Sequence, residues 1–200
     1  MRFLILAENE LLEVPKEIGQ LVKLENLMLY KNRLRELPEE VYQLKKLVWL
    51  DVYYNQLENI SEKVGNLQEL EVLFLSHNKL ERLPSSIATV PSLRELYAHH
   101  NWLTGLPDSF SELHNLRYLL LQSNYIAEFP NEILAMENLE ELNLAQNKLL
   151  SVPDELIQLK KLEKLYLNDN SIEPGTIEHE KLKVVMKVFN ERKASINFDF

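Results

Sequence analysis

Residues 24–46 read LENLMLYKNRLRELPEEVYQLKK, and residues 47–69 read LVWLDVYYNQLENISEKVGNLQE. The two segments have the same length, and one asparagine and most of the leucines fall at the same places in both. This asparagine recurs every 23 residues, with no insertion or deletion, at Asn9, Asn32, Asn55, Asn78, Asn101, Asn124, Asn147 and Asn170. An internal repeat of this length predicts a solenoid, in which each unit buries its apolar face only against its neighbours.

The apolar residues of each unit keep fixed distances from its asparagine. Positions −8, −5 and −3 are apolar in every unit, and positions +2, +5, +9 and +12 are apolar in the first seven. The spacing of two predicts a short strand, and the spacing of three suits a turn of helix on the opposite side of the coil. Proline stands at +6 in six units, and acidic residues follow most of these prolines, as expected where a helical turn begins.

The units resemble leucine-rich repeats of the form LxxLxxLxLxxNxLxxLPxxIxxLxx, most closely the 23-residue subclass with the LPxxI signature. That subclass occurs in intracellular Ras-group scaffolds, plant intracellular repeat proteins and many bacterial proteins. The resemblance covers residues 1–172. It implies an α/β fold: a right-handed horseshoe with a concave parallel sheet of about eight strands, short convex helices and a C-terminal helical cap. It also implies a role in binding other proteins, without naming the ligand.

The asparagine column is interpreted as structural. An asparagine side chain offers two N–H donors and a carbonyl acceptor, which can pair with turn backbone that the coil buries. Serines at the start of a helical turn, Ser85 and Ser86, are interpreted as capping residues.

The two ends of the chain differ from the repeats. Residues 173–200 leave the repeat pattern, and we expect them to form the cap as a unit distinct from repeats 1–172. Within it, residues 195–200 alternate like a last short strand, and residues 177–191 predict an amphipathic helix whose apolar face holds Ile177, Leu182, Val185, Met186 and Phe189. At the other end, unit one begins at position −8 without a cap. We expect either a cap outside this sequence or an end-to-end contact there, such as a homodimer.

Composition excludes several classes of function. The chain has 200 residues, a net charge of −9 and no cysteine. Acidic charge disfavours general binding to nucleic acid or an anionic membrane, and the apolar runs are too short for membrane insertion. Without cysteine there is no disulfide, thiolate metal site or cysteine nucleophile. A cytoplasmic location is favoured, while secretion would need a signal peptide upstream.

No cofactor and no enzymatic activity are expected. The sequence contains no P-loop, no G-x-G-x-x-G, no H-E-x-x-H and no G-x-S-x-G motif. The alternatives to a stand-alone binding module are the regulatory arm of a larger kinase, GTPase or ubiquitin ligase, and a secreted adhesion or virulence protein.

The candidate binding surface is the concave face, to which positions −6, −4, −2 and −1 are expected to point. These positions hold nine aromatic residues, although the core is already filled by aliphatic ones. Exposed aromatic patches mark interaction sites, so we expect a protein or peptide to bind there. The alternative is that aromatic residues favour strand positions and no partner exists. The expected anchors are Tyr30, Trp49, Tyr53, Phe74, Tyr97 and Tyr118.

Two further features lie on this predicted surface. Asp51 could receive a basic side chain of a partner or could be an ordinary solvated carboxylate. His77, His99 and His100 could bind metal, sense pH or serve as ordinary contact residues. No carboxylate is placed to complete a metal site, since Glu95 lies about 13 Å along the strand from His99. No metal site is therefore assigned.

Overall fold

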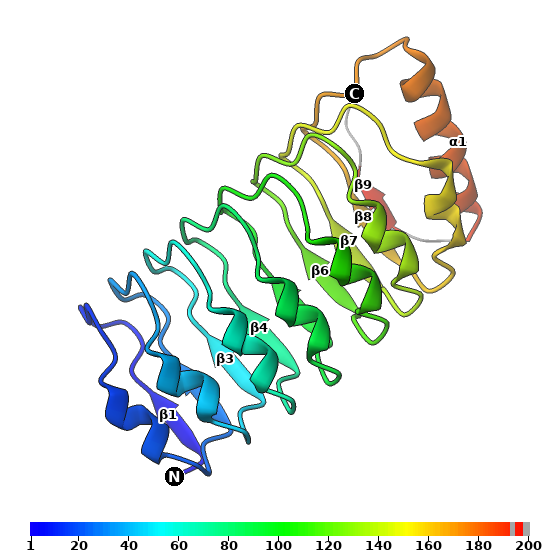
Figure 1. Cartoon of the computed structure of the whole chain (residues 1–200). Helices are drawn as coiled ribbons and strands as arrows, with labels where there is room; N and C mark the ends of the chain where they lie inside the picture. Colours follow the sequence, from blue (N-terminus) through cyan, green and yellow to red (C-terminus); the bar gives the residue numbers. More distant parts are fainter. Residues whose placement is uncertain (193–194, 198–200) are drawn as a thin grey trace.

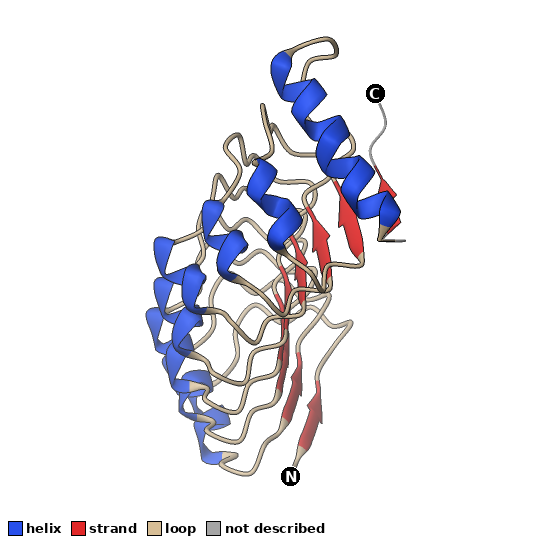
Figure 2. Cartoon of the chain, turned by 90° about the vertical axis from the view of Figure 1, so that its right-hand side faces the viewer, coloured by secondary structure: helices blue, strands red, loops and turns tan. Residues whose placement is uncertain are grey.

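The computed structural model describes residues 1–192 and 195–197, and its repeats form a curved solenoid (Figure 1). The nine strands found in these residues are parallel and lie in one sheet in chain order. Figure 2 shows the strands along one side of the coil and the helical turns along the other. The strands are β1 Phe3–Ile5, β2 Asn26–Met28, β3 Trp49–Asp51, β4 Val72–Phe74, β5 Glu95–Tyr97, β6 Tyr118–Leu120, β7 Glu141–Asn143, β8 Lys164–Tyr166 and β9 Ser195–Asn197.

The predicted leucine-rich-repeat architecture is confirmed, and the convex helices are short 3-10 turns. Only five residues of each of the first seven units are helical, and the tighter 3-10 geometry is typical of such short pieces. Each turn follows a residue at +6 with φ between −65° and −70°. The turns are η1 Lys16–Gln20, η2 Glu39–Gln43, η3 Glu62–Asn66, η4 Ser85–Thr89, η5 Asp108–Glu112, η6 Asn131–Ala135 and η7 Asp154–Gln158.

The core follows the repeat positions. Neighbouring strands pair in register, so that Leu27 lies beside Leu50, Leu50 beside Leu73 and Leu73 beside Leu96. All four side chains are at most 1% exposed. Unit one has a neighbour on one side only, and its Leu4 and Leu6 are only partly buried.

The asparagine column is also confirmed, and it joins successive repeats. Asn78 Nδ2 donates to the carbonyl of Leu75 in its own unit at 2.9 Å and to that of Val52 in the preceding unit at 3.0 Å. The N–H of Leu57, also in the preceding unit, donates to Asn78 Oδ1 at 2.9 Å. Asn9 differs, because its Nδ2 donates to the carbonyls of Leu6 and Ala7 in its own unit.

The starts of the 3-10 turns correct one expectation. Ser85 and Ser86 do not cap η4, because Pro84 occupies the cap position and makes no side-chain capping bond. Instead Glu62, in the preceding unit, accepts the backbone N–H of Ser85 at 3.1 Å and that of Ser86 at 2.9 Å. These backbone hydrogen bonds lower the pKa of Glu62, and the bond from the N–H of Ser86 contributes most. Acidic residues after +6 can therefore stabilise the next turn as well as their own.

The C-terminal helix α1, Ile177–Glu191, covers the last repeat. It contacts η7 and β9, and it buries Leu182, Val185 and Phe189 as expected, with Met186 partly buried. Ile177 was expected on the same face but is 75% exposed. At about 100° per residue it lies about 140° around the helix from Leu182, so it points away from the repeats. The expected strand over 195–200 is confirmed for 195–197, and 198–200 lie outside the described residues.

The asparagine hydrogen bonds give the first testable prediction. Asn78→Ala leaves a buried carbonyl of Val52 and a buried N–H of Leu57 without their side-chain partner. We expect the free energy of unfolding to fall by about 1–3 kcal/mol. Asn9→Ala is the matched control, since Asn9 is exposed and bonds only within its own unit, and its effect should stay within about 0.5 kcal/mol. Urea unfolding followed by circular dichroism measures both variants. Equal losses of unfolding free energy would show that the hydrogen bonds between repeats add no stability.

Candidate functional site

The repeat geometry stacks equivalent side chains of the strand surface. Neighbouring parallel strands lie about 4.8 Å apart, and every unit has the same length, so each position forms a column across the sheet. On the strand side, positions −6 and −4 come from the strands themselves, and positions −2 and −1 follow where each strand ends. Ring contacts between neighbouring repeats are a direct consequence.

One group of contacts runs along β3 to β5. The rings of Trp49 and Phe74 lie 5.0 Å apart between centroids, and those of Phe74 and Tyr97 lie 4.3 Å apart and nearly parallel, at 9°. All three side chains are half-buried. The Tyr97 hydroxyl donates to Glu95 at 2.7 Å, and Trp49 Nε1 has no hydrogen-bond partner among the described residues. We call Trp49, Phe74 and Tyr97 the aromatic ladder.

A second group lies at the ends of β3 to β5. Tyr54, His77 and His100 occupy the −1 column of three successive units, with centroids 4.7 Å and 4.1 Å apart. His99 packs edge-on against both histidines, and Tyr53 contacts His77 at 5.1 Å. We call His77, His99 and His100 the histidine cluster.

The backbone explains how successive residues come to share this surface. Along a regular strand, neighbouring side chains point to opposite faces. The −1 residues instead have positive φ in all eight units, including 57° at Tyr54, 54° at His77 and 52° at His100. This left-handed conformation ends the strand and brings His100 to 5.3 Å from His99 between ring centroids.

The histidine cluster disfavours positive charge. Burial, followed by the neighbouring imidazoles of His100 and His77, lowers the pKa of His99 to about 4. Burial and then His100 also lower the pKa of His77. His99 is therefore a neutral imidazole at neutral pH.

Asp51 is half-buried beside the aromatic ladder. Its Oδ1 accepts the backbone N–H of Tyr53 at 2.9 Å. Burial raises the pKa of the Asp51 carboxyl, and this hydrogen bond opposes the rise. At the equivalent position of a later unit, Asn143 Oδ1 accepts the N–H of Ala145 at 3.0 Å. The repeat therefore keeps the same hydrogen bond with a neutral residue.

Two of the expected anchors, Tyr30 and Tyr118, lie apart from these ring contacts. Within the described part of the chain, Tyr30 and Tyr118 make no ring contact with the aromatic ladder or the histidine cluster. Tyr118 instead lies under the guanidinium of Arg117 and donates to Glu140 at 3.2 Å. Tyr54 was not among the expected anchors, although the 23-residue step from Tyr54 to His77 would have indicated its stacking.

A hollow of about 460 Å³ adjoins the histidine cluster at the rim of the sheet. It is lined by His100, Trp102 and Tyr125, among others, and both aromatic side chains are nearly half exposed. This places Trp102 and Tyr125 within reach of a ligand on the strand surface.

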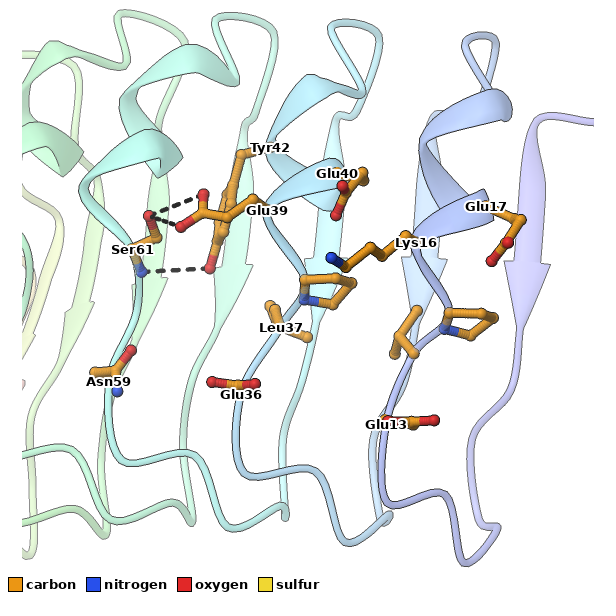
Figure 3. Close-up of a pocket in the computed structure, with 13 residues that line it drawn as sticks. Glu13, Lys16, Glu17, Glu36, Leu37, Glu39, Glu40, Tyr42, Asn59 and Ser61 are labelled. Atoms are coloured by element: carbon orange, nitrogen blue, oxygen red, sulfur yellow. Dashed lines mark hydrogen bonds between the residues drawn. The ribbon is translucent and has the colours of Figure 1, made fainter.

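A second hollow, of about 720 Å³, lies away from the strand surface beside η1 to η3 (Figure 3). Its carboxylates come from several units, and Glu39 turns toward Ser61, whose hydroxyl donates to it at 3.0 Å. The N–H of Ser61 donates to the hydroxyl of Tyr42 at 3.4 Å, and burial raises the pKa of that hydroxyl to about 12. The hollow thus offers acidic surface and no activated nucleophile among its lining residues.

Comparison with known proteins settles the family. A family model for the leucine rich repeat matches residues 45–103 and 114–172. The chain belongs to the leucine-rich repeat family. Leucine-rich repeat domains are typically non-catalytic and generally bind proteins or peptides. No helix in the described part of this leucine-rich repeat chain is long and apolar enough to cross a membrane.

Solved leucine-rich repeat structures are similar along the chain. A Leptospira interrogans leucine-rich repeat protein shares 34% identity with a TM-score of 0.80, over 98% of this chain and 54% of that one. The plant peptide hormone receptor RGFR1, solved in complex with RGF2, shares 25% identity with a TM-score of 0.65, over 79% of this chain and 30% of that one. Internalin C2 of Listeria monocytogenes shares the fold at 20% identity and a TM-score of 0.76, over 98% and 80% of the two chains.

This leucine-rich repeat chain therefore spans about half the length of the Leptospira protein and less than a third of the plant receptor. No curated protein sequence matches the chain.

Asp51 provides a second prediction. Because burial raises its pKa, the ionised carboxylate is less stable in the folded than in the unfolded chain. Asp51→Asn should therefore raise the melting temperature at pH 7, while keeping the bond from Tyr53 as Asn143 does from Ala145. The gain should shrink as the pH falls below the raised pKa of the folded state and vanish below about 3, where the carboxyl is protonated in both states.

The matched reverse change is Asn143→Asp, which should lower the melting temperature at pH 7. Thermal unfolding by circular dichroism at several pH values measures both variants. A lower melting temperature for Asp51→Asn at pH 7 would mean that the hydrogen bond to the charged carboxylate outweighs the effect of burial.

Proposed function

We propose that this chain is a non-catalytic recognition module that binds a protein or peptide across strands β3 to β6. The observation that carries the proposal is the aromatic ladder. Three large rings lie side by side on the strand surface, where the core does not need them, and they remain partly open to solvent. Tyrosine and tryptophan in such positions give large contact areas at low entropic cost.

The charges on this surface favour a basic ligand. Positions −6, −4, −2 and −1 of the units that carry β3 to β7 include Asp51 and Glu95, as well as Glu141, which pairs with Lys164 of the next unit at 2.9 Å, and no lysine or arginine. Asp51 is already partly desolvated, so a lysine or arginine of a ligand would meet a carboxylate that water solvates poorly. We therefore propose a ligand segment that combines basic with aromatic or aliphatic side chains.

The relatives support a peptide-sized ligand. The similar plant peptide hormone receptor RGFR1 was solved in complex with RGF2. The 23-residue LPxxI subclass is likewise proposed for this chain, on the repeat spacing. End-to-end pairing through the edge of β1, where Phe3 and Ile5 are exposed, stays a prediction that measurement of the mass in solution would test.

The test is selection of ligands from a random peptide library displayed on phage. Peptides selected on the wild-type chain should share basic and aromatic residues. The variant Trp49→Ala, Phe74→Ala and Tyr97→Ala should bind them at least about tenfold more weakly, because hot-spot side chains contribute most of the binding energy. Asp51→Asn should weaken the binding of basic peptides in particular.

The matched control is Leu12→Ala with Leu150→Ala, which removes exposed apolar side chains outside the aromatic ladder. Circular dichroism checks that each variant is folded. Peptides that bind the ladder variant and the wild type equally well would place the binding site elsewhere, and the proposal would be wrong.

A further inference from the structure

The histidine cluster brings three imidazoles to one point on the strand surface. One nitrogen of each of His77, His99 and His100 lies within 4.8 Å of the nitrogens of the other two. In a tetrahedral zinc site, with bonds of about 2.0–2.1 Å, ligand nitrogens are about 3.4 Å apart. The three rings would therefore need to converge by at most about 1.4 Å, which rotation about χ2 can supply because that torsion has broad minima.

The state of the rings suits a metal ligand. A metal ion binds an imidazole nitrogen that carries no proton, and a neutral imidazole offers one such nitrogen. His99 Nδ1 is buried and has no hydrogen-bond partner among the described residues. A buried polar nitrogen without a partner costs free energy, and a metal ion that bound it or fixed the ring would offset part of that cost.

The sequence singled out these three histidines as able to bind metal, but no site was assigned because no carboxylate is placed to join them. Zinc chemistry does not impose that requirement. Three imidazoles form a sufficient ligand set for Zn²⁺, with a solvent molecule in the fourth position. His100 is exposed, so the fourth position can face water on the strand side.

We propose that His77, His99 and His100 bind one divalent transition-metal ion of the class that prefers imidazole, such as Zn²⁺. The two strand-end histidines of the −1 column approach from neighbouring units, and His99 approaches from the side. Hard cations such as Mg²⁺ and Ca²⁺ prefer oxygen ligands and should not compete. This proposal does not rest on the proposed function, since it concerns the chain without any peptide.

The test is calorimetric titration of the full chain, prepared without a polyhistidine tag, with Zn²⁺. We expect saturable binding of one ion per chain and no response to Mg²⁺. His99→Gln and His100→Gln should each weaken binding by more than about tenfold, since even changes outside the direct ligands of a metal can cost 10–100-fold. The chain holds five histidines, and His114→Gln, which changes an exposed histidine outside the cluster, should leave binding unchanged.

A second readout separates ligation from an indirect effect on stability. In nuclear magnetic resonance spectra of the imidazole rings, Zn²⁺ should shift the signals of three histidines and leave the other two in place. Zn²⁺ should also raise the melting temperature of the wild type but not of His100→Gln. Either no saturable binding to the wild type, or equal affinity in the His99→Gln and His114→Gln variants, would overturn the proposal.

Discussion

The structure depends on the hydrogen bonds of one asparagine in each repeat. Each asparagine from the second unit onward donates to a carbonyl of its own unit and a carbonyl of the preceding one, and accepts an N–H of the preceding one. A buried turn backbone needs such partners, because unpaired N–H and C=O groups are costly away from water. The bonds hold successive coils in one register, and this register explains why a 23-residue period without insertions was retained along the whole solenoid.

Fixed register has a consequence for the surface. Any residue type that recurs at one position becomes a stacked column, whether or not packing of the core needs it. The aliphatic positions −5 and −3 become the core in this way. The same spacing sets Phe74 on Tyr97 and His77 on His100, where the rings face the strand side. A solenoid of this kind builds binding chemistry from single residues in neighbouring units.

The positive-φ residues join these columns into a site. A non-glycine residue in the left-handed region costs about 1–2 kcal/mol, yet all eight units carry one before the asparagine. In the three units that hold Tyr54, His77 and His100, the bulky side chain at this position lies against the next ring of the column. Position −4 shows that a side chain can also change its charge there. Asp51 in one unit and Asn143 in another accept the same backbone hydrogen bond, although only the aspartate can be charged. The strand surface can therefore vary while the coil stays the same.

The sequence by itself determined the repeat, its strands, its core positions and the role of the asparagine column, because a strict period leaves only one way to bury the leucines. It also indicated the aromatic strand surface, since Trp49, Phe74 and Tyr97 are not needed in the core. Only the tertiary structure decided which of these side chains touch. Ring rotamers, the left-handed turn at His100 and the inter-repeat bond of Glu62 depend on neighbouring coils rather than on spacing along the chain. The sequence marked His77, His99 and His100 as candidates, but the meeting of their imidazole nitrogens within 4.8 Å is a property of that packing and does not follow from spacing along the chain.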